Sequence, residues 1–368
     1  MQKDKRIFVH IGQHKTGSTS IQNALINNKT ILNKNNIYFF RENPDGSDGM
    51  NSESWVEPIR PFNTNSWPKL QKPECYDDVY KIINPEILAK KLSNLPGDVI
   101  ISSESLSLVN RDDKLSEFKS CLKKYFNKII IIIYIRRQDA QIISHSQEEA
   151  KGGGSFNKFG FFFNNNTAIP KYSDYFNEYL DYSNRLSKWG DVFGDSNLLI
   201  KIFEKKLLLN EDVVQDFFKT IGVETILYSS RENESWGFEK SKVVFLMQTI
   251  KMNSYMMQII EQNMDNSGKL LPSRNEAIGL YSIYKNNNEK LNKRFSINNN
   301  KYLFNDDFSM YPESKMDIWT EESANQAICN ILEAVNNITP RRLFFISIKL
   351  RASFVRKKIR NIRLLINL

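Results

Sequence analysis

The stretch VHIGQHKTGSTSIQ, residues 9–22, gathers residue types that bind anions. Gly12 and Gly17 have the G-x-x-x-x-G spacing of a phosphate-binding loop. Nucleotide triphosphatases place a lysine directly after the second glycine, but here Lys15 stands two residues before it. The hydroxyl residues of the stretch are Thr16, Ser18, Thr19 and Ser20. Three interpretations are open: a degenerate ATP site, a chance pair of glycines, or a loop that binds an anion other than a triphosphate.

A second candidate anion site lies in IYIRRQDAQIIS, residues 133–144. Arg136 follows an isoleucine-rich run, and Ser144 comes eight residues after it. A guanidinium fork and a hydroxyl can converge on one phosphate group. The alternative is a solvated strand end with no ligand. A second anion site in this position favours the anion-binding interpretation of the first loop.

The elements around these residues are those that a phosphate cradle requires. RIFVHIG (6–12) reads as a buried strand and STSIQNALINNKTIL (18–32) as a helix, so the loop 12–20 joins a strand to a helix. Such a loop directs backbone N–H groups and the positive end of the helix at one spot. Lys15 precedes the helix, where its ammonium can reach the far side of a bound anion.

Strands alternate with helices through most of the chain. DVIISSESL (98–106), KIIIIIYIRR (128–137) and SNLLIKIFE (196–204) read as strands, and the isoleucine run is typical of a central parallel strand. Residues 115–127 and 211–223 read as helices, and the pattern from about 237 to 335 is mainly helical. The alternation predicts an α/β fold around a mostly parallel sheet, with a helical C-terminal part. We expect one domain over residues 1–338 and a separate tail over 339–368.

The net charge of +9 is concentrated in that tail. Residues 341–368 contain nine Lys or Arg and no acid, which leaves 51 − 9 = 42 basic residues against 42 acidic ones in the rest of the chain. A neutral body gives no support for nucleic-acid binding. Apolar residues recur in the tail at helical spacing, at Phe344, Ile348, Val355, Ile359, Ile362 and Ile366. This pattern predicts a basic amphipathic helix on an anionic membrane surface, or a helix that docks on the body.

Cysteine and histidine usage predicts neither disulfides nor a metal site. The three cysteines are far apart, with no C-x-x-C, and the three histidines do not complete a metal-ligand spacing. The N-terminus enters a strand without a signal-peptide apolar region, and no apolar run is long enough to span a membrane. We therefore expect a cytoplasmic protein that is peripheral at the inner membrane surface.

Together these stretches resemble the sulfotransferases that use 3′-phosphoadenosine 5′-phosphosulfate (PAPS). KTGSTS (15–20) is similar to that family's 5′-phosphosulfate loop, and RRQDAQIIS (136–144) to its 3′-phosphate motif. The resemblance covers roughly residues 5 to 310 and extends to bacterial carbohydrate sulfotransferase-like proteins. It implies a three-layer, P-loop-like α/β domain. The donor-site residues that it implies are Lys15, Thr16, Gly17, Ser18, Thr19, Ser20, Arg136 and Ser144.

The resemblance also implies a reaction. A sulfuryl group would pass in line from PAPS to a hydroxyl of a polysaccharide, oligosaccharide or glycolipid, leaving adenosine 3′,5′-bisphosphate. Lys15 would stabilise the charge that grows on the bridging oxygen, without a metal ion. Arg136 and Ser144 would hold the 3′-phosphate and fix the position of the donor.

A general base should accept the proton of the acceptor hydroxyl. Glu104, in ISSES at the end of a predicted strand, is the first candidate, and His14 beside Lys15 is the second. Glu42 and Glu53 lie in the loop-rich region after the first helix and are further candidates. The alternative for Glu104 is a carboxylate that caps the following turn. His10 and His145 are expected to be packing residues.

Two other functions fit parts of the sequence. A P-loop kinase or ATPase with a shifted lysine would bind ATP with Mg²⁺. A non-catalytic, membrane-associated module on a degenerate nucleotide-binding fold would keep the tail and lose nucleotide affinity. Binding of adenosine 3′,5′-bisphosphate without metal separates the sulfotransferase from both.

Overall fold

The centre of the protein is a parallel β-sheet. The computed structural model describes residues 5–58, 80–151, 167–169, 174–224, 236–250, 252 and 254–338. Five strands form the sheet in the order β2-β5-β1-β6-β7, and every neighbouring pair is parallel. Their bounds are β1 Arg6–His10, β2 Ile37–Phe39, β5 Asp98–Ser102, β6 Lys128–Ile135 and β7 Leu198–Ile202. The predicted α/β fold with a parallel sheet is confirmed.

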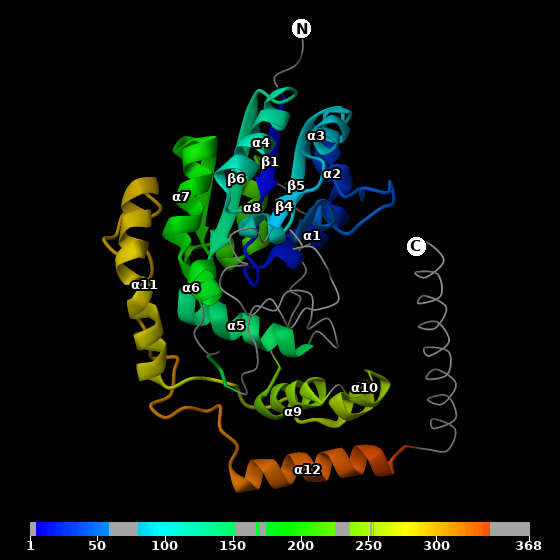
Figure 1. The fold of residues 1–368 in the computed structure, drawn as a ribbon, viewed down its shortest axis with the longest axis vertical. Helices are drawn as coiled ribbons and strands as arrows, with labels where there is room; N and C mark the ends of the chain where they lie inside the picture. The colour runs from blue at the N-terminus through cyan, green and yellow to red at the C-terminus, as the bar shows by residue number, and fades with distance from the viewer. Residues whose placement is uncertain are drawn as a thin grey trace.

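Helices cover both faces of this sheet and make the three layers (Figure 1). On one face lie α1 (Ser18–Asn27), α2 (Lys29–Lys34) and α8 (Val213–Thr220). On the other face lie α3 (Pro85–Ser93), α4 (Asp112–Lys123) and α7 (Tyr182–Phe193). Because side chains alternate along a strand, Ile7 and Val9 of β1 pack on the second face while Phe8 packs on the first.

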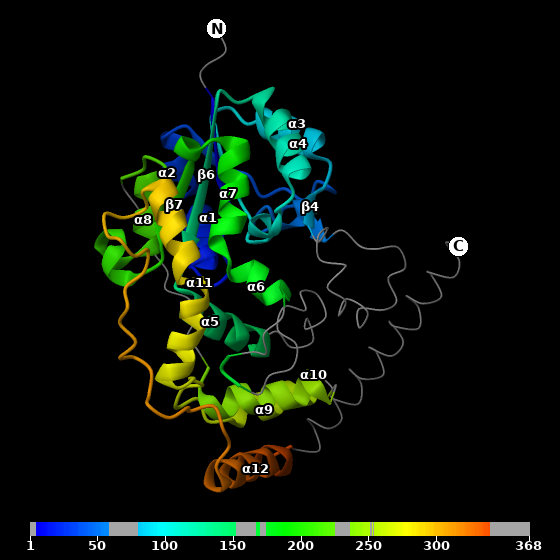
Figure 2. The ribbon, with the colours of Figure 1, turned by 60° about the vertical axis from the view of Figure 1, so that its left-hand side comes forward.

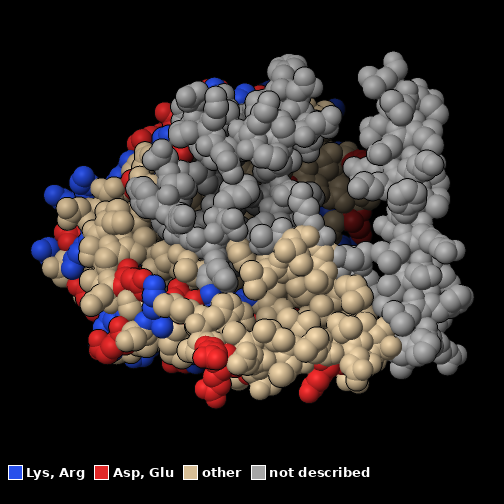
Figure 3. Space-filling model, turned by 60° about the horizontal axis from the view of Figure 1, so that its bottom comes forward, with Lys and Arg blue, Asp and Glu red and all other residues tan. Residues whose placement is uncertain are grey.

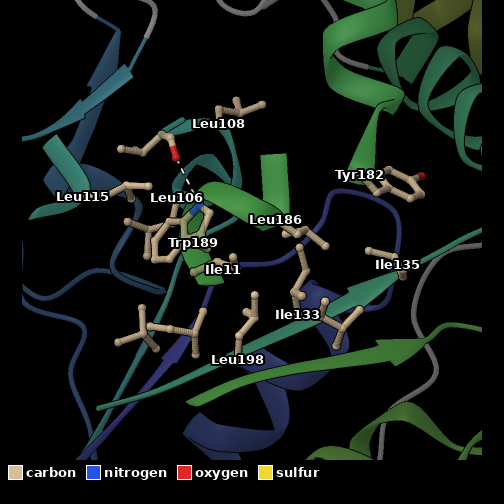
Figure 4. Packing of buried hydrophobic residues seen from close by; sticks show 14 of the residues in the cluster. Ile11, Leu106, Leu108, Leu115, Ile133, Ile135, Tyr182, Leu186, Trp189 and Leu198 are labelled. Atoms are coloured by element: carbon tan, nitrogen blue, oxygen red, sulfur yellow. Dashed lines mark hydrogen bonds between the residues drawn. The ribbon is translucent and has the colours of Figure 1, made fainter. Parts of the chain in front are cut away.

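Strand β6 confirms the expectation drawn from its isoleucine run. All its residues after Lys128 are buried, and it lies between β1 and β7. Ile133 and Ile135 pack with Leu186 and Trp189 of α7 in the larger core (Figure 4). The Trp189 indole Nε1 donates a hydrogen bond to the carbonyl oxygen of Val109 at 3.1 Å, so its polar atom is satisfied inside this core.

Three element boundaries differ from the sequence expectation. The helix predicted over 18–32 breaks at Asn28, whose side chain donates to the Ala24 carbonyl at 2.9 Å and competes with the regular helix bonds. The strand predicted over 98–106 ends at Ser102 and is followed by the 3₁₀ turn η4 (Ser105–Leu108). The strand predicted over 128–137 ends at Ile135. The two shorter strands place Glu104 and Arg136 just beyond the sheet.

The C-terminal part is helical, as expected. Helices α9 (Phe238–Thr249), α10 (Ser254–Asn263) and α12 (Glu321–Asn336) share a small core of their own. Helix α11 (Arg274–Phe295) runs beside α7, and α5 (Gln138–Lys151) lies below the carboxyl ends of the strands (Figure 1). Figure 2 shows α9, α10 and α12 on the far side of α5 from the sheet.

The remaining elements are short. Strands β3 (Val56–Pro58) and β4 (Tyr80–Ile82) form an antiparallel pair, and α6 (Asp174–Leu180) precedes α7. The other 3₁₀ turns are η1 (Glu53–Trp55), η6 (Asp195–Asn197), η7 (Lys205–Leu207) and η8 (Leu209–Glu211). Among the residues described, no helix has the length and apolar character to cross a membrane. The predicted tail, 339–368, lies outside the described residues.

Candidate functional site

The loop between β1 and α1 has glycines where a side chain would not fit. Gly17 has φ +81°, and a Cβ there would lie 2.7 Å from Val213 Cγ1 and 3.2 Å from the Phe203 ring. Gly12 has φ +86°, and its Cβ would lie 3.0 Å from the Glu104 Cα. Both the backbone conformation and the close neighbours therefore require glycine. The G-x-x-x-x-G pair has a structural reason and is not a chance spacing.

Two of the loop hydroxyls brace the loop from within. Thr16 Oγ1 donates to the Gln13 carbonyl oxygen at 2.6 Å, and Ser18 Oγ donates to the same oxygen at 3.1 Å. Gly17 occupies the N-cap of α1 and offers no side-chain acceptor to the first-turn N–H groups. The backbone N–H groups of this turn are thus the main anion donors in this conformation. Of the two remaining hydroxyl residues, Thr19 is exposed and Ser20 is partly exposed.

Lys15 places a positive charge between the loop and the candidate bases. It has φ +61°, and its side chain is partly exposed. Its charge lowers the pKa values of Glu104 and His14 and, on α5, that of His145. These effects require short distances, so the structure brings Lys15, Glu104 and His14 together.

Arg136 is the first residue after β6 and is partly buried at the same edge of the sheet. Its guanidinium carbon lies 5.9 Å from the centre of the Phe203 ring. Burial lowers the pKa of its guanidinium. Within the described part of the chain, the guanidinium makes no hydrogen bond or ion pair that would compensate this burial. An anionic ligand would supply the missing partner.

The neighbouring Arg137 has a different role. Its Nε and Nη2 donate to the two carboxylate oxygens of Asp139 at 2.8 and 3.0 Å. Its Nη1 donates to the carbonyl oxygens of Asn305 and Asp307 at 3.0 and 2.7 Å. Arg137 therefore ties the segment after α11 to the start of α5. Of the arginine pair, only Arg136 is placed to bind a ligand.

Phe203 links the two candidate anion sites. It follows β7, and its backbone N–H donates to the Ile135 carbonyl oxygen at 2.7 Å. One part of its ring lies beside Gly17, and the Arg136 guanidinium lies over the ring. Phe203 thus brings the N-terminus of α1 and the Arg136 guanidinium next to each other at one edge of the sheet.

Helix α5, which carries Ser144, contacts the same loop. Gln141 Nε2 donates to the His14 carbonyl oxygen at 2.7 Å, and the His145 ring centre lies 5.3 Å from that of His14. Ser144 lies three residues after Gln141 on α5 and is partly exposed, and the described contacts between α5 and the loop are those of Gln141 and His145. Ser144 and Arg136 make no direct hydrogen bond with each other in the described structure.

His10 and His145 are packing residues, as expected. His10 is fully buried, its ring lies edge-on to Phe217 with ring centres 5.1 Å apart, and its Nδ1 is hydrogen-bonded to Ser102 Oγ at 2.8 Å. Burial lowers its pKa to about 3. His145 packs on His14 and Tyr179, and burial keeps its pKa well below the ordinary value.

His14 is a weak base in this environment. Burial lowers its pKa to about 4, and the positive charges of Arg185 and Lys15 lower it further in the same direction. Its ring also lies near Tyr179, with ring centres 6.3 Å apart. The imidazole is neutral at physiological pH, and its affinity for a proton is low.

Glu104 is the stronger base. Its Oε2 accepts a hydrogen bond from Gln22 Nε2 at 3.1 Å, and its side chain makes no capping bond to the turn η4 that it precedes. Burial and the negative charge of Glu53 raise its pKa to about 7, while the Gln22 bond and the charge of Lys15 oppose the rise. The alternative of a turn-capping carboxylate is not what the structure shows.

The two further base candidates differ in position. Glu53 reaches the same edge of the sheet, where its carboxylate accepts hydrogen bonds from Ser103 Oγ at 2.6 Å and from Ser105 Oγ. Glu42 forms an ion pair with Lys91 of α3. The structure therefore brings Glu53, and not Glu42, to Glu104.

Sequence reasoning missed three residues that shape this site, namely Gln22, Asn51 and Phe203. Gln22 lies on the buried face of α1 beside Ile21 and Leu25. A polar residue at a buried helical position needs hydrogen-bond partners, and this signal was present in the sequence. Asn51 and Phe203 had no such signal, because their neighbours come from distant segments.

Comparison with known proteins gives distant similarities. No protein-family model matches the chain. An uncharacterised protein of Archaeoglobus fulgidus is 28% identical over 126 residues, which span 34% of this chain and 30% of that protein. Among solved structures, a sulfotransferase from Alicyclobacillus acidocaldarius is 13% identical with a TM-score of 0.40, covering 79% of this chain and 96% of that one. The mouse sulfotransferase SULT7A1 in complex with PAP is 12% identical with a TM-score of 0.28, covering 80% of this chain and 82% of that one.

Proposed function

We propose that this protein is a PAPS-dependent sulfotransferase that acts on a carbohydrate hydroxyl. The observation that carries the proposal is the pair of anion-binding points on either side of Phe203. One is the start of α1 with Lys15, and the other is the buried Arg136 guanidinium. PAPS carries anionic groups at two separate positions of one nucleoside, and it would place one group at each point.

A kinase or ATPase would use the turn at α1 but would leave Arg136 without a role. A linear triphosphate would occupy the turn at α1 and would supply no acceptor for the Arg136 guanidinium. The sequence resemblance of residues 15–20 and 136–144 also favours the sulfotransferase over the kinase. A non-catalytic module would have no need for a carboxylate with a pKa of about 7 beside the loop.

The chemistry assigned to this site is an in-line transfer. The bound donor supplies the sulfuryl group. Glu104 takes the proton of the acceptor hydroxyl as the new oxygen–sulfur bond forms, and the bond from sulfur to the phosphate oxygen breaks. Lys15 and the first-turn N–H groups of α1 stabilise the negative charge that the departing oxygen gains. Arg136 and Ser144 hold the other end of the donor in register.

Glu104 is preferred to His14 as the base because of their proton affinities. A base works best when its pKa lies near the working pH, and Glu104 meets this condition while His14, with a pKa of about 4, does not. Gln22 also fixes the position of the Glu104 carboxylate. His14 then serves to hold the loop against α5 through the bond from Gln141.

We also infer that an anionic lipid surface receives the C-terminal part. The nine basic residues of 341–368 follow α12 directly, and α12 contains no Lys or Arg. Ile328, Leu332 and Val335 are 53%, 61% and 45% exposed, and their spacing of four and three residues makes one apolar stripe on α12. Figure 3 shows a largely uncharged face with a few acidic groups at its edge. This supports peripheral attachment at the cytoplasmic membrane surface, near a carbohydrate acceptor.

The test of the proposed function is calorimetric titration with adenosine 3′,5′-bisphosphate in EDTA, with ATP for comparison. We expect the bisphosphate to bind and ATP to give no signal. Arg136→Ala should weaken binding by on the order of 2–5 kcal/mol, because a buried charged contact is lost. Lys15→Ala should lower the rate of sulfuryl transfer from PAPS by on the order of 10²–10³-fold.

The matched control is Arg6→Ala. Arg6 lies at the opposite end of β1 and pairs with Asp98, so its loss should leave bisphosphate binding unchanged. Binding of ATP that requires Mg²⁺ would overturn the proposal in favour of the kinase. Absence of binding by either nucleotide would overturn it in favour of the non-catalytic module.

A further inference from the structure

Two carboxylates meet at the carboxyl end of β5, and the simple base described above uses only one of them. We infer that Glu53 and Glu104 act as a coupled pair, in which Glu104 contacts the acceptor hydroxyl and Glu53 and Gln22 are positioning residues that control its proton. The inference rests on the proposed function for the reaction that the pair serves. Its geometry stands on hydrogen bonds among described residues alone.

Glu53 is held by the residues on either side of Glu104. Ser103 Oγ donates to its Oε2 at 2.6 Å, Ser105 Oγ donates to its Oε1, and the Ser105 N–H lies 3.4 Å from Oε2. All these contacts place hydrogen-bond donors on the Glu53 carboxylate, so its position beside Glu104 is fixed. In the sequence Ser103-Glu104-Ser105, the two serines thus hold the Glu53 carboxylate, and Glu104 stands between them.

Gln22 connects the Glu104 carboxylate to the backbone of Glu53. Its Nε2 donates to Glu104 Oε2 and to Ser102 Oγ, both at 3.1 Å. Its Oε1 accepts from Asn51 Nδ2 at 3.1 Å, and Asn51 Oδ1 accepts from the Glu53 N–H at 3.0 Å. Because the amide oxygen of Gln22 is occupied, its nitrogen is directed at Glu104. The bonds form a path from Glu53 through Asn51 and Gln22 to Glu104.

The charges around Glu104 come from two elements. Glu53 of η1 raises the pKa of Glu104, and Lys15 of the loop lowers it. Gln22 of α1 also lowers it by its hydrogen bond, while burial makes the largest contribution and raises it. Tyr80 of β4 faces Glu53, and burial together with the Glu53 charge raises the pKa of that phenol far above its usual value, so it stays neutral.

The function of the pair follows from this arrangement. An isolated glutamate is a poor proton acceptor at neutral pH, but one beside a fixed negative charge holds a proton more tightly. The acceptor O–H bond breaks toward Glu104 as the oxygen–sulfur bond forms. The electron pair of the broken sulfur–oxygen bond leaves on the donor phosphate near Lys15. Glu53 acts on Glu104 through its negative charge and is not itself the proton acceptor in this proposal.

The test compares wild type with Glu53→Gln and Gln22→Leu. The Glu104 carboxyl is followed by ¹³C NMR, with its signal assigned by its loss in Glu104→Gln. In Glu53→Gln we expect the titration midpoint to fall by on the order of one pH unit, because a neighbouring negative charge is gone. In Gln22→Leu we expect it to rise, because a hydrogen bond to the ionised form is gone. The acid limb of the pH profile of kcat/KM should move in the same directions.

Glu42→Gln is the matched control. It removes the same charge from the same region, but Glu42 pairs with Lys91 and should leave the midpoint unchanged. If Glu53→Gln does not fold, Glu53→Asp replaces it. Its side chain is one methylene shorter, so the carboxylate lies farther from Glu104, and the Glu104 midpoint should fall by less than in Glu53→Gln. A midpoint unmoved by both Glu53 variants would overturn the pair.

The outcome is separable from that of the proposed function. The NMR titration measures the effect of Glu53 on Glu104 whether or not adenosine 3′,5′-bisphosphate binds. If the midpoint shifts and the bisphosphate does not bind, only the proposed function fails. Bisphosphate binding with an unmoved midpoint overturns the pair and leaves the sulfotransferase in place. Equal midpoint shifts in Glu53→Gln and Glu42→Gln would also overturn the pair, because they would reflect net charge alone.

Discussion

Neighbouring residues of one type have opposite roles in this site, and Arg136 and Arg137 show why. Arg137 is surrounded by acceptors from Asp139, Asn305 and Asp307, so its charge is compensated inside the protein. Arg136 lies at the strand end beside Phe203 without such acceptors among the described residues. The two side chains have the same chemistry but different contacts: Arg137 stabilises the fold, and Arg136 is the one that we propose binds the donor.

This difference predicts opposite effects on stability. Arg137→Ala breaks a buried ion pair, whose side chains are 9% and 0% exposed, and leaves Asp139 without its cation. We expect its free energy of unfolding to fall by on the order of 3–5 kcal/mol. Arg136→Ala removes a charge that has no compensating partner, so stability without ligand should be unchanged or higher. Urea denaturation of both variants measures this.

A large loss of stability in Arg136→Ala would contradict the interpretation, since it would reveal a structural role for that guanidinium. The same denaturation experiment with added adenosine 3′,5′-bisphosphate compares the ligand's effect on the stability of the two proteins. The ligand should raise the stability of wild type through linkage and have no such effect on Arg136→Ala.

At the scale of elements, the site depends on the point where α1 begins. Helix α1 starts against α8 and the end of β7, and Gly17 makes this approach possible. The turn also leaves the first N–H groups of α1 without a capping side chain. Gly17 and the first turn of α1 therefore determine both how α1 packs against α8 and whether its N–H groups are open to an anion.

We expect Gly17→Ala to damage both properties. The positive φ and the contact with Val213 should lower stability by on the order of 1–3 kcal/mol and weaken bisphosphate binding. Gly279→Ala is the control, because a Cβ at this exposed position of α11 meets no atom within 4 Å. It should raise stability by roughly 0.5–1 kcal/mol. Thermal unfolding and calorimetry of the two variants check this, and equal binding in wild type and Gly17→Ala would argue against an anion site at this turn.

At the scale of the whole molecule, the site and the C-terminal helices lie in different regions. Helices α9, α10 and α12 have their own core below α5 (Figures 1 and 2). The apolar stripe of α12 lies beside the inward-facing Ala327 and Ala334 and does not take part in that core. Attachment to a surface through the apolar stripe of α12, as we propose, would therefore leave the site open.

This arrangement predicts binding to anionic vesicles. The protein should float with phosphatidylglycerol-containing vesicles and not with neutral phosphatidylcholine vesicles, with a decrease at high salt. Leu332→Asp should weaken the association, because it places a charge in the apolar stripe. Replacement of Arg356, Lys357 and Lys358 by Gln should weaken it further.

The control for the stripe is Leu207→Asp, a leucine that is 57% exposed on η7. It should leave vesicle binding unchanged. Self-association that is lost in Leu332→Asp, without any vesicle binding, would instead assign the stripe to a contact between copies of this chain.

The sequence by itself determined the parallel α/β fold, because periodicity and β-branched runs are local and mark buried strands directly. It also determined the loop of residues 12–17 and the position of Arg136 at a strand end, since both are fixed by adjacent elements. It ranked Glu104 first and His14 second as candidate bases and kept Glu42 and Glu53 as further candidates. Only the tertiary structure separated them, because proton affinity depends on burial and on charges brought from distant segments. The meeting of Glu53 with Glu104, 51 residues apart, is a product of packing at the end of β5 and has no local signal in the sequence.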